Sequence, residues 1–214
     1  MFTLVLSFIH ISSGTIALIC GFLALLTKNQ LHKHRSFGKL YKNAMAIVVF
    51  TAFPLAIIRP NIFLFCIAIF SGYLSFVGVR TIMLKSLKLQ RLDQCISASV
   101  LLTSSVSIIT LSLNLYTVSR IEFKLIALTF ASIGFALSFS ELALSQLIWK
   151  PLGYIGKHQT FINSALTATS TAALVTLSNY IPIHPLLAWL GPTIIVIPII
   201  TYNNFKRALK LGKK

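Results

Sequence analysis

Residues 3–41 read TLVLSFIHISSGTIALICGFLALLTKNQLHKHRSFGKLY, a long apolar run followed directly by a basic cluster. The hydrocarbon core of a bilayer is about 30 Å thick and requires a helix of roughly 20 mostly apolar residues. Residues 3–27 meet that requirement, and residues 31–41 carry the charges that hold an adjoining helix end among lipid headgroups. The stretch therefore predicts a membrane-spanning helix with a basic segment at one membrane face.

The composition of the whole chain points to the same class of protein. Of its 214 residues, 56% are hydrophobic and 10% are charged, and 19 Lys and Arg stand against three acids. A soluble domain usually carries about 25% charged residues. The basic residues separate apolar runs instead of covering a polar scaffold, which excludes a soluble enzyme domain and argues against nucleic acid as a partner. The partner that this pattern favours is a lipid bilayer with anionic headgroups.

Six further apolar runs follow the first one. The expected spans are about 3–27, 43–59, 61–84, 96–117, 123–148, 160–180 and 186–204. The second is the weakest of them, because it is short and contains Pro54. The sequence thus predicts an all-α integral membrane protein, a single domain over residues 1–214 built as a bundle of seven transmembrane helices.

The distribution of charge predicts the orientation of this bundle. All but three of the 19 Lys and Arg fall in alternate breaks and in the tail, and the exceptions are Arg59, Arg120 and Lys124. By the positive-inside rule the N-terminus lies outside and the C-terminus in the cytoplasm. The first run lacks a basic n-region and exceeds the apolar core of a signal peptide, so we expect it to remain uncleaved. The expected location is the inner (plasma) membrane of a bacterium.

Two ionisable residues lie well inside the expected spans, His10 and Glu141. Such groups are costly in a membrane, so each is a functional hypothesis by default. In a transporter, Glu141 is a proton-accepting carboxylate and both residues line a polar path. In a non-catalytic membrane component, the same two residues stabilise packing through hydrogen bonds. The sequence leaves these two alternatives open.

The histidines raise a different hypothesis. His34 and His158 lie at helix starts on the expected cytoplasmic face, whereas His10 lies roughly 10 Å inside the outer end of the first span. A pair of imidazoles can ligate a b-type haem, so His34 and His158 are the favoured ligands and His10 a further one. Zinc hydrolysis is an alternative if His32, His34 and His158 cluster, although no HExxH motif is present. No catalytic residue is identified.

Two patterns concern helix packing. The residues of two small-xxx-small rows are Ser164, Ala168 and Ala172 in one, and Ser132, Ala136 and Ser140 in the other. Such rows favour close helix contact, and a polar substrate path is the alternative. The segments KHRSFGKLYKNAM (33–45) and KHQTFINSALTAT (157–169) share Lys-His and a Phe three residues after His, which suggests an internal duplication or a shared helix-start design.

The segments FIHISSGTIALICGFLALLTKNQLHKHRSFGKLYKNAM (8–45) and AIFSGYLSFVGVRTI (68–82) resemble the domain of unknown function 2306 family, small bacterial multi-pass membrane proteins. The resemblance covers most of residues 8–84 and a shorter part near 158–170. The positions that carry it are His10, Gly14, Ala17, Gly21, His34, Arg35, Gly38, Tyr41, Tyr73, Gly78, Arg80 and His158. Ser164 stands where the family commonly has Arg. The resemblance implies a multi-pass membrane fold and this choice of histidines, and it implies no activity.

Overall fold

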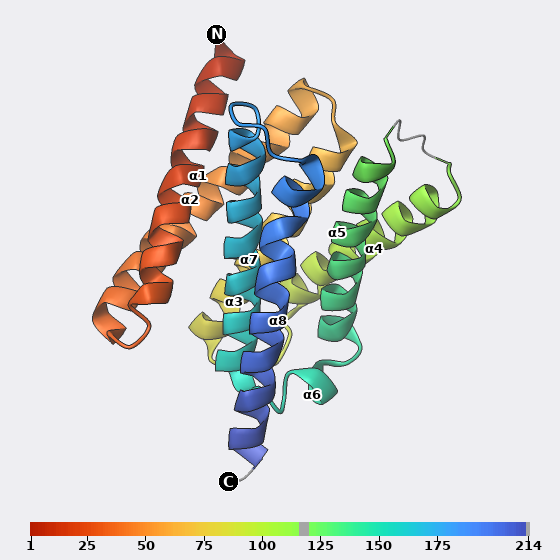
Figure 1. Ribbon diagram of the computed structural model, residues 1–214. Helices are drawn as coiled ribbons and strands as arrows, with labels where there is room; N and C mark the ends of the chain where they lie inside the picture. The colour runs from red at the N-terminus through yellow and green to blue at the C-terminus, as the bar shows by residue number, and fades with distance from the viewer. Residues whose placement is uncertain (116–119, 213–214) are drawn as a thin grey trace.

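The computed structural model describes residues 1–115 and 120–212, and within these ranges all regular structure is α-helical (Figure 1). The helices are α1 (Phe2–Leu26), α2 (Leu31–Ile58), α3 (Ile62–Leu84), α4 (Arg91–Ser112), α5 (Ile121–Leu142), α6 (Ser145–Ile148), α7 (Gly153–Leu177) and α8 (Pro185–Gly212). α6 is a single turn, and each of the others is long enough to cross a hydrocarbon core of about 30 Å.

Six of the long helices, α1 to α5 and α8, also have the apolar composition of membrane spans. This confirms that the chain is helical and has the character of a multi-pass membrane protein. α7 is the exception, because it is rich in Ser and Thr. Several of these hydroxyls, among them Thr160, Thr167 and Thr169, donate to the carbonyl four residues earlier in the helix. Those bonds satisfy the hydroxyls inside the helix itself and lower the cost of placing them away from water.

The helices are arranged around a central group of α3, α7 and α8. The α1–α2 hairpin lies on one side of this group and the α4–α5 hairpin on the other (Figure 1). The N-terminus and the C-terminus lie at opposite ends of the bundle. We call the end that carries the C-terminus the C-terminal end; α3 and α5 finish there, and α4 and α7 begin there.

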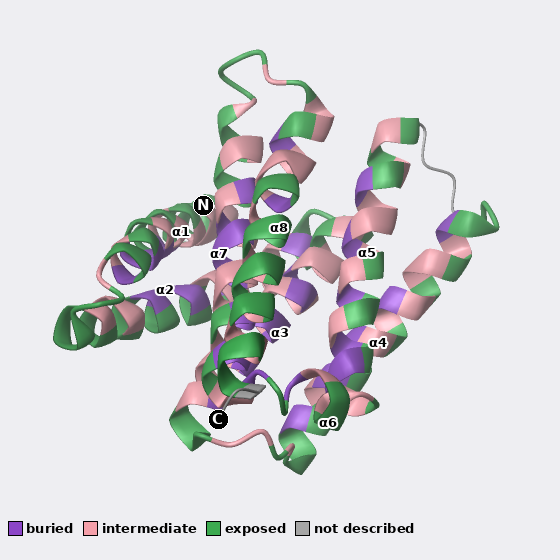
Figure 2. Cartoon of the chain, turned by 60° about the horizontal axis from the view of Figure 1, so that its bottom comes forward, coloured by how far each residue is buried: buried purple, intermediate pink, exposed green. Residues whose placement is uncertain are grey.

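Buried residues gather on the inward faces of the helices, whereas α1 and α8 keep long exposed faces (Figure 2). The exposed residues on α8 are largely apolar and include Ile194, Ile195 and Ile199. An exposed apolar surface of this length is a liability in water and the ordinary outer surface of a helix in lipid. The burial pattern thus agrees with the apolar composition of these helices.

The basic segment 31–41 is helical, so the expectation that it separates two helices is wrong. α2 begins at Leu31 and not at 43. The reason is that Leu, Lys and Arg are good helix formers and their charged heads reach water from a helix as easily as from a loop. α2 is about 42 Å long, which exceeds the hydrocarbon thickness by roughly two turns. Pro54 lies inside α2 and does not end it.

Other boundaries also differ from the expected spans. α4 begins at Arg91 because Gln90 and Asp93 form a capping box, in which the Gln90 backbone N–H donates to Asp93 Oδ2 at 2.7 Å. α5 ends at Leu142, and the chain turns through α6 and Gly153, whose φ of 67° is left-handed. Positions 116 and 117 of the expected fourth span lie outside the described residues.

The two small-xxx-small rows lie only partly at helix contacts, because Ser140 is buried and Ala168 packs against the core. Ala172, Ser132 and Ala136 are exposed. The tight contacts lie instead at Gly21 and Gly78. A Cβ at Gly21 would lie 2.6 Å from Leu166 Cδ1, and one at Gly78 would lie 2.7 Å from Ile162 Cγ1. These glycines therefore let α1 and α3 approach α7 closely.

Candidate functional site

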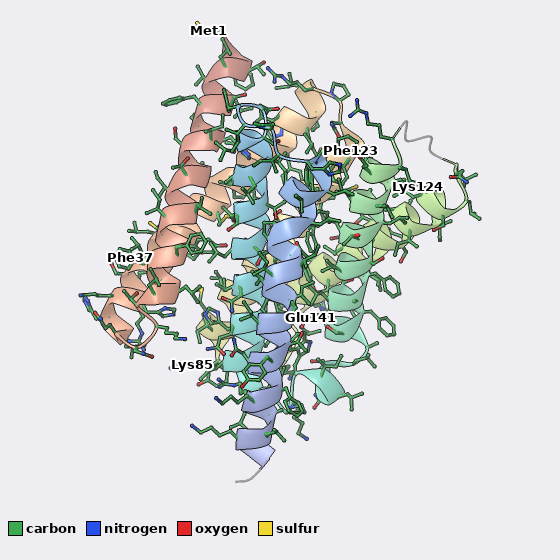
Figure 3. All side chains as sticks on the ribbon, viewed as in Figure 1. Met1, Phe37, Lys85, Phe123, Lys124 and Glu141 are labelled. Carbon is green, nitrogen blue, oxygen red and sulfur yellow. The ribbon has the colours of Figure 1, made fainter. Side chains whose placement is uncertain are left out.

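A buried ion pair joins α5 to α7 near the C-terminal end of the bundle. Glu141 lies in the last turn of α5 and is 0% exposed, and Lys157 lies in the second turn of α7 and is 2% exposed. Glu141 Oε2 is 2.7 Å from Lys157 Nζ, at an angle that departs from hydrogen-bond geometry. Figure 3 shows Glu141 at the lower end of α5, inside the bundle. A carboxylate without water contact is costly unless a cation compensates it, and Lys157 is that cation.

A second ion pair lies beside the first and joins α3 to α4. Arg80, in the last turns of α3, pairs through Nε with Oδ1 of Asp93 and also donates to the side chain of Gln90. Asp93 is buried and lies close enough to Glu141 for their charges to interact. Two cations and two carboxylates from four helices therefore meet in one cluster with no net charge.

The four charged residues share a narrow cleft. Its other lining residues are Val77, Thr81, Leu84, Ser86, Lys88 and Leu89. Its volume of about 10 Å³ is at the threshold of what one water molecule requires. Glu141 Oε1 has no hydrogen-bond partner among the described residues. The cleft lies beside this carboxylate and is lined also by Ser86 and Lys88, from the segment between α3 and α4.

The structure brings His34 and His158 into the same region but outside the ion-pair cluster. His34 Nδ1 donates to the carbonyl of Ala24 at 2.8 Å, and His158 Nδ1 donates to the carbonyl of Gly78 at 2.7 Å. The two rings lie close enough for the charge on one to act on the other. Because a carbonyl oxygen only accepts, each Nδ1 carries a proton, and the neutral form of each ring presents its lone pair on Nε2.

His10 lies in a different part of the bundle. Its Nδ1 is 2.9 Å from Thr51 Oγ1, which in turn donates to Ile47 O at 2.7 Å. α1 contacts α2 and α7 and makes no contact with α5 within the described part of the chain. His10 and Glu141 therefore lie on helices that are not adjacent, and their sharing of one polar path stays a prediction.

A zinc centre built from His32, His34 and His158 is not formed. Within residues 1–115 and 120–212, no three His, Cys, Asp or Glu side chains come together as a metal group. His184 lies near the start of α8, where its Nε2 is 3.5 Å from Glu122 Oε1. Of the predicted ligands His10, His34 and His158, the structure therefore places His34 and His158 near each other.

The remaining motif residues fall into two groups. Those at helix contacts are Tyr41 and Tyr73, which are 3% and 1% exposed, together with Gly78 and Arg80 described above. Gly14 is only in ordinary contact with Val48, and Gly38 has no atom within 4 Å of where a Cβ would lie. Arg35 is exposed. Part of the motif therefore consists of residues that pack helices together, and these residues need not take part in chemistry.

Sequence reasoning missed Lys157 and Asp93, which were counted only as charges in breaks between spans. Lys157 precedes His158 at a helix start, and the positive-inside distribution of Lys and Arg predicts that Lys157 lies among the headgroups. One signal was present: Asp93 is one of only three acids in a chain with 19 Lys and Arg, so each acid had many partners available. That signal does not say which cation pairs with which acid.

Comparisons with models of protein families, with curated proteins and with solved structures found no match for this chain.

Proposed function

We propose that this chain is a membrane transport protein that moves protons through a centre formed by Glu141 and Lys157. The observation that carries the proposal is a fully buried carboxylate in a span-length apolar helix, paired with a buried lysine. Ionisable groups at such positions commonly mark ion and proton pathways. The second pair, Arg80 and Asp93, connects this centre to the polar end of the bundle.

A purely structural role explains the ion pair less well. Replacing a buried ion pair by well-packed apolar residues is often neutral or stabilising, so stability alone does not favour charge at these positions. A carboxylate can gain and lose a proton without moving its helix. When Glu141 Oε1 takes up a proton from water in the cleft, Lys157 keeps its charge and the cluster becomes positive by one. Release of the proton to the other side restores the neutral cluster.

The proposal includes a topology. Seven spans, with α7 as the sixth along the chain, place the N-terminus outside and the basic C-terminal tail in the cytoplasm of a bacterial cell, in contact with anionic headgroups. Support comes from the opposite positions of the termini and from the central location of α7, which α3 and α8 cover. A helix shielded by protein need not be as apolar as one facing lipid. We also propose membership of the domain of unknown function 2306 family, for which the motif residues of the sequence are the support.

Glu141→Gln is expected to abolish proton flux, because the amide keeps the size of the side chain and cannot carry a proton as a carboxyl does. The protein is reconstituted in liposomes that contain a pH-sensitive dye, and valinomycin with a potassium gradient sets the membrane potential. Wild type should acidify or alkalinise the lumen faster than protein-free liposomes, and Glu141→Gln should match the protein-free rate.

Glu122→Gln is the matched control for this experiment. Glu122 lies at the opposite end of α5, and its side chain is 31% exposed. This variant should transport protons at the wild-type rate. Flux equal to that of protein-free liposomes in wild type, or wild-type flux in Glu141→Gln, contradicts the proposed function.

Electron transfer through a b-type haem is a second candidate, favoured by the locked rings of His34 and His158. A histidine that ligates a metal usually donates its other ring N–H to a carbonyl or carboxylate, and both rings do so here. The two Nε2 atoms would hold the iron, and the haem would supply one-electron chemistry. The residues fit the group in this respect.

Purified protein from haem-supplemented cells should then show a Soret band that shifts on reduction with dithionite. His34→Ala and His158→Ala should each remove the band, because one remaining imidazole cannot supply both axial ligands. His32→Ala, on the exposed side of the same helix turn, is the control and should keep it. Absence of the band in wild type, or its survival in both variants, excludes the haem assignment.

A further inference from the structure

Two buried hydroxyls lie just above Glu141 in the bundle, on helices other than its own. Tyr73 on α3 is 1% exposed and Ser97 on α4 is 0% exposed. Neither hydroxyl has a hydrogen-bond partner among the described residues. Buried hydroxyls in proteins are nearly always satisfied, by protein or by ordered water. Two such groups beside a buried carboxylate are therefore a place where internal water is expected.

The two hydroxyls and the carboxylate are neighbours. The Tyr73 hydroxyl lies beside that of Ser97 and within electrostatic range of the Glu141 carboxylate. The ring of Tyr73 packs edge-on against Phe161, with ring centroids 5.5 Å apart. This packing holds the Tyr73 ring in place against α7. At separations beyond direct hydrogen bonding, a bridging water completes such a contact.

Polar groups continue from Ser97 along the seam between α4 and α5. Ser104 is buried, two turns further along α4, and lies against Gly134 of α5, where a Cβ would be 2.6 Å from Ser104 Oγ. Ser138, between Gly134 and Glu141, donates to the Gly134 carbonyl at 2.6 Å. From Ser97 to Ser104 the seam rises about 10 Å toward the opposite end of the bundle. Gly134 leaves the space that the Ser104 hydroxyl occupies.

We propose that Tyr73, Ser97 and Ser104 form, with bridging water, the internal route by which protons travel between Glu141 and the opposite end of the bundle. This inference rests on the proposed function. It concerns the part of the proton pathway between Glu141 and the opposite end of the bundle, and the cleft forms the part between Glu141 and the C-terminal end. In each step a hydroxyl or water accepts one proton and releases another, so no group changes its charge permanently. At Glu141 one O–H bond forms or breaks, and Lys157 balances the carboxylate when the proton has left.

Tyr73→Phe is expected to lower proton flux in the same liposome assay by roughly 100-fold, the low end of what a positioned proton-transfer group contributes. Ser97→Ala should act in the same direction. Tyr41→Phe is the matched control, because Tyr41 is also buried and its hydroxyl also lacks a partner, yet it lies beside Thr169 and Ser75 in another part of the bundle. That variant should retain wild-type flux.

The outcomes separate the two proposals. One result refutes the route and leaves the proposed function standing. In it, wild type transports protons and Glu141→Gln abolishes the flux, but Tyr73→Phe and Ser97→Ala both keep the wild-type flux. If wild type shows no flux, the proposed function and the route both fail. A solvent deuterium isotope effect on wild-type flux, together with unchanged resistance of Tyr73→Phe to unfolding by SDS, distinguishes lost proton transfer from lost folding. Equal losses in Tyr73→Phe and Tyr41→Phe also overturn the route.

Discussion

Lys157→Met should lower the free energy of unfolding by about 3–5 kcal/mol, because it leaves Glu141 as a buried charge without a partner. Met has nearly the length of Lys and fills the same space, so the loss reports the missing charge and not a cavity. The measurement is unfolding in mixed micelles by increasing SDS, followed through tryptophan fluorescence. A buried carboxylate without its cation can take up a proton, so the loss should be smaller at acidic than at alkaline pH.

Two controls accompany this variant. Lys150→Met replaces an exposed lysine seven residues earlier and should change the unfolding free energy by no more than about 0.5 kcal/mol. The double variant Glu141→Gln with Lys157→Met removes both charges and should regain most of the lost stability. If Lys157→Met unfolds like wild type, then Glu141 is not held by Lys157 and the described ion pair is wrong.

Phe161→Ala should lower the free energy of unfolding by about 3–5 kcal/mol, the usual cost of removing a large aromatic side chain from a core. Phe161 is 0% exposed and lies between Tyr73 and Trp149, at ring-centroid distances of 5.5 and 5.4 Å. Helix association in a membrane depends on such packing, because lipid tails are as apolar as the side chains. The same SDS titration measures the effect.

Phe8→Ala is the matched control for Phe161→Ala. Phe8 is 72% exposed on the outer face of α1, so its removal should cost about 0.5 kcal/mol or less. Because Phe161 also holds the ring of Tyr73, Phe161→Ala should reduce proton flux in the protein that remains folded. Equal destabilisation by the two substitutions contradicts the assignment of Phe161 to the core.

The apolar runs predicted the helices well and their ends poorly. Each expected span overlaps one long helix, since length and hydropathy are properties of single segments, but only 3–27 and 61–84 agree with their helices, α1 and α3, to within one residue at both ends. The start of α7 and the end of α8 differ from the expected bounds by seven and eight residues. The start of α2 was missed by twelve residues because a basic segment is as compatible with a helix as with a loop. The end of α5 was missed because α6 continues the apolar pattern after a turn.

The functional site was predicted only in part. Glu141 was singled out because an acid inside an apolar run is costly wherever its helix lies. The structure shows this residue buried in an ion pair, and its role in function stays a prediction. The residue that pairs with it was not predicted, since periodicity along one helix does not say which other helix packs against it. The proximity of His34 and His158 agrees with their predicted common face, but the carbonyls that lock their rings belong to Ala24 and Gly78, which no pattern connected to them.

The sequence by itself determined that this chain forms long apolar helices and that its basic residues gather in particular breaks, because hydropathy and charge are read along one dimension. Only the tertiary structure decided that Lys157 turns inward to Glu141 and Arg80 to Asp93. The long side chain of a lysine at a helix end can extend to the headgroups or turn to a buried carboxylate, and the sequence is compatible with both. The choice depends on how α7 is rotated about its own axis, and the close contact between Gly78 of α3 and Ile162 of α7 restricts that rotation.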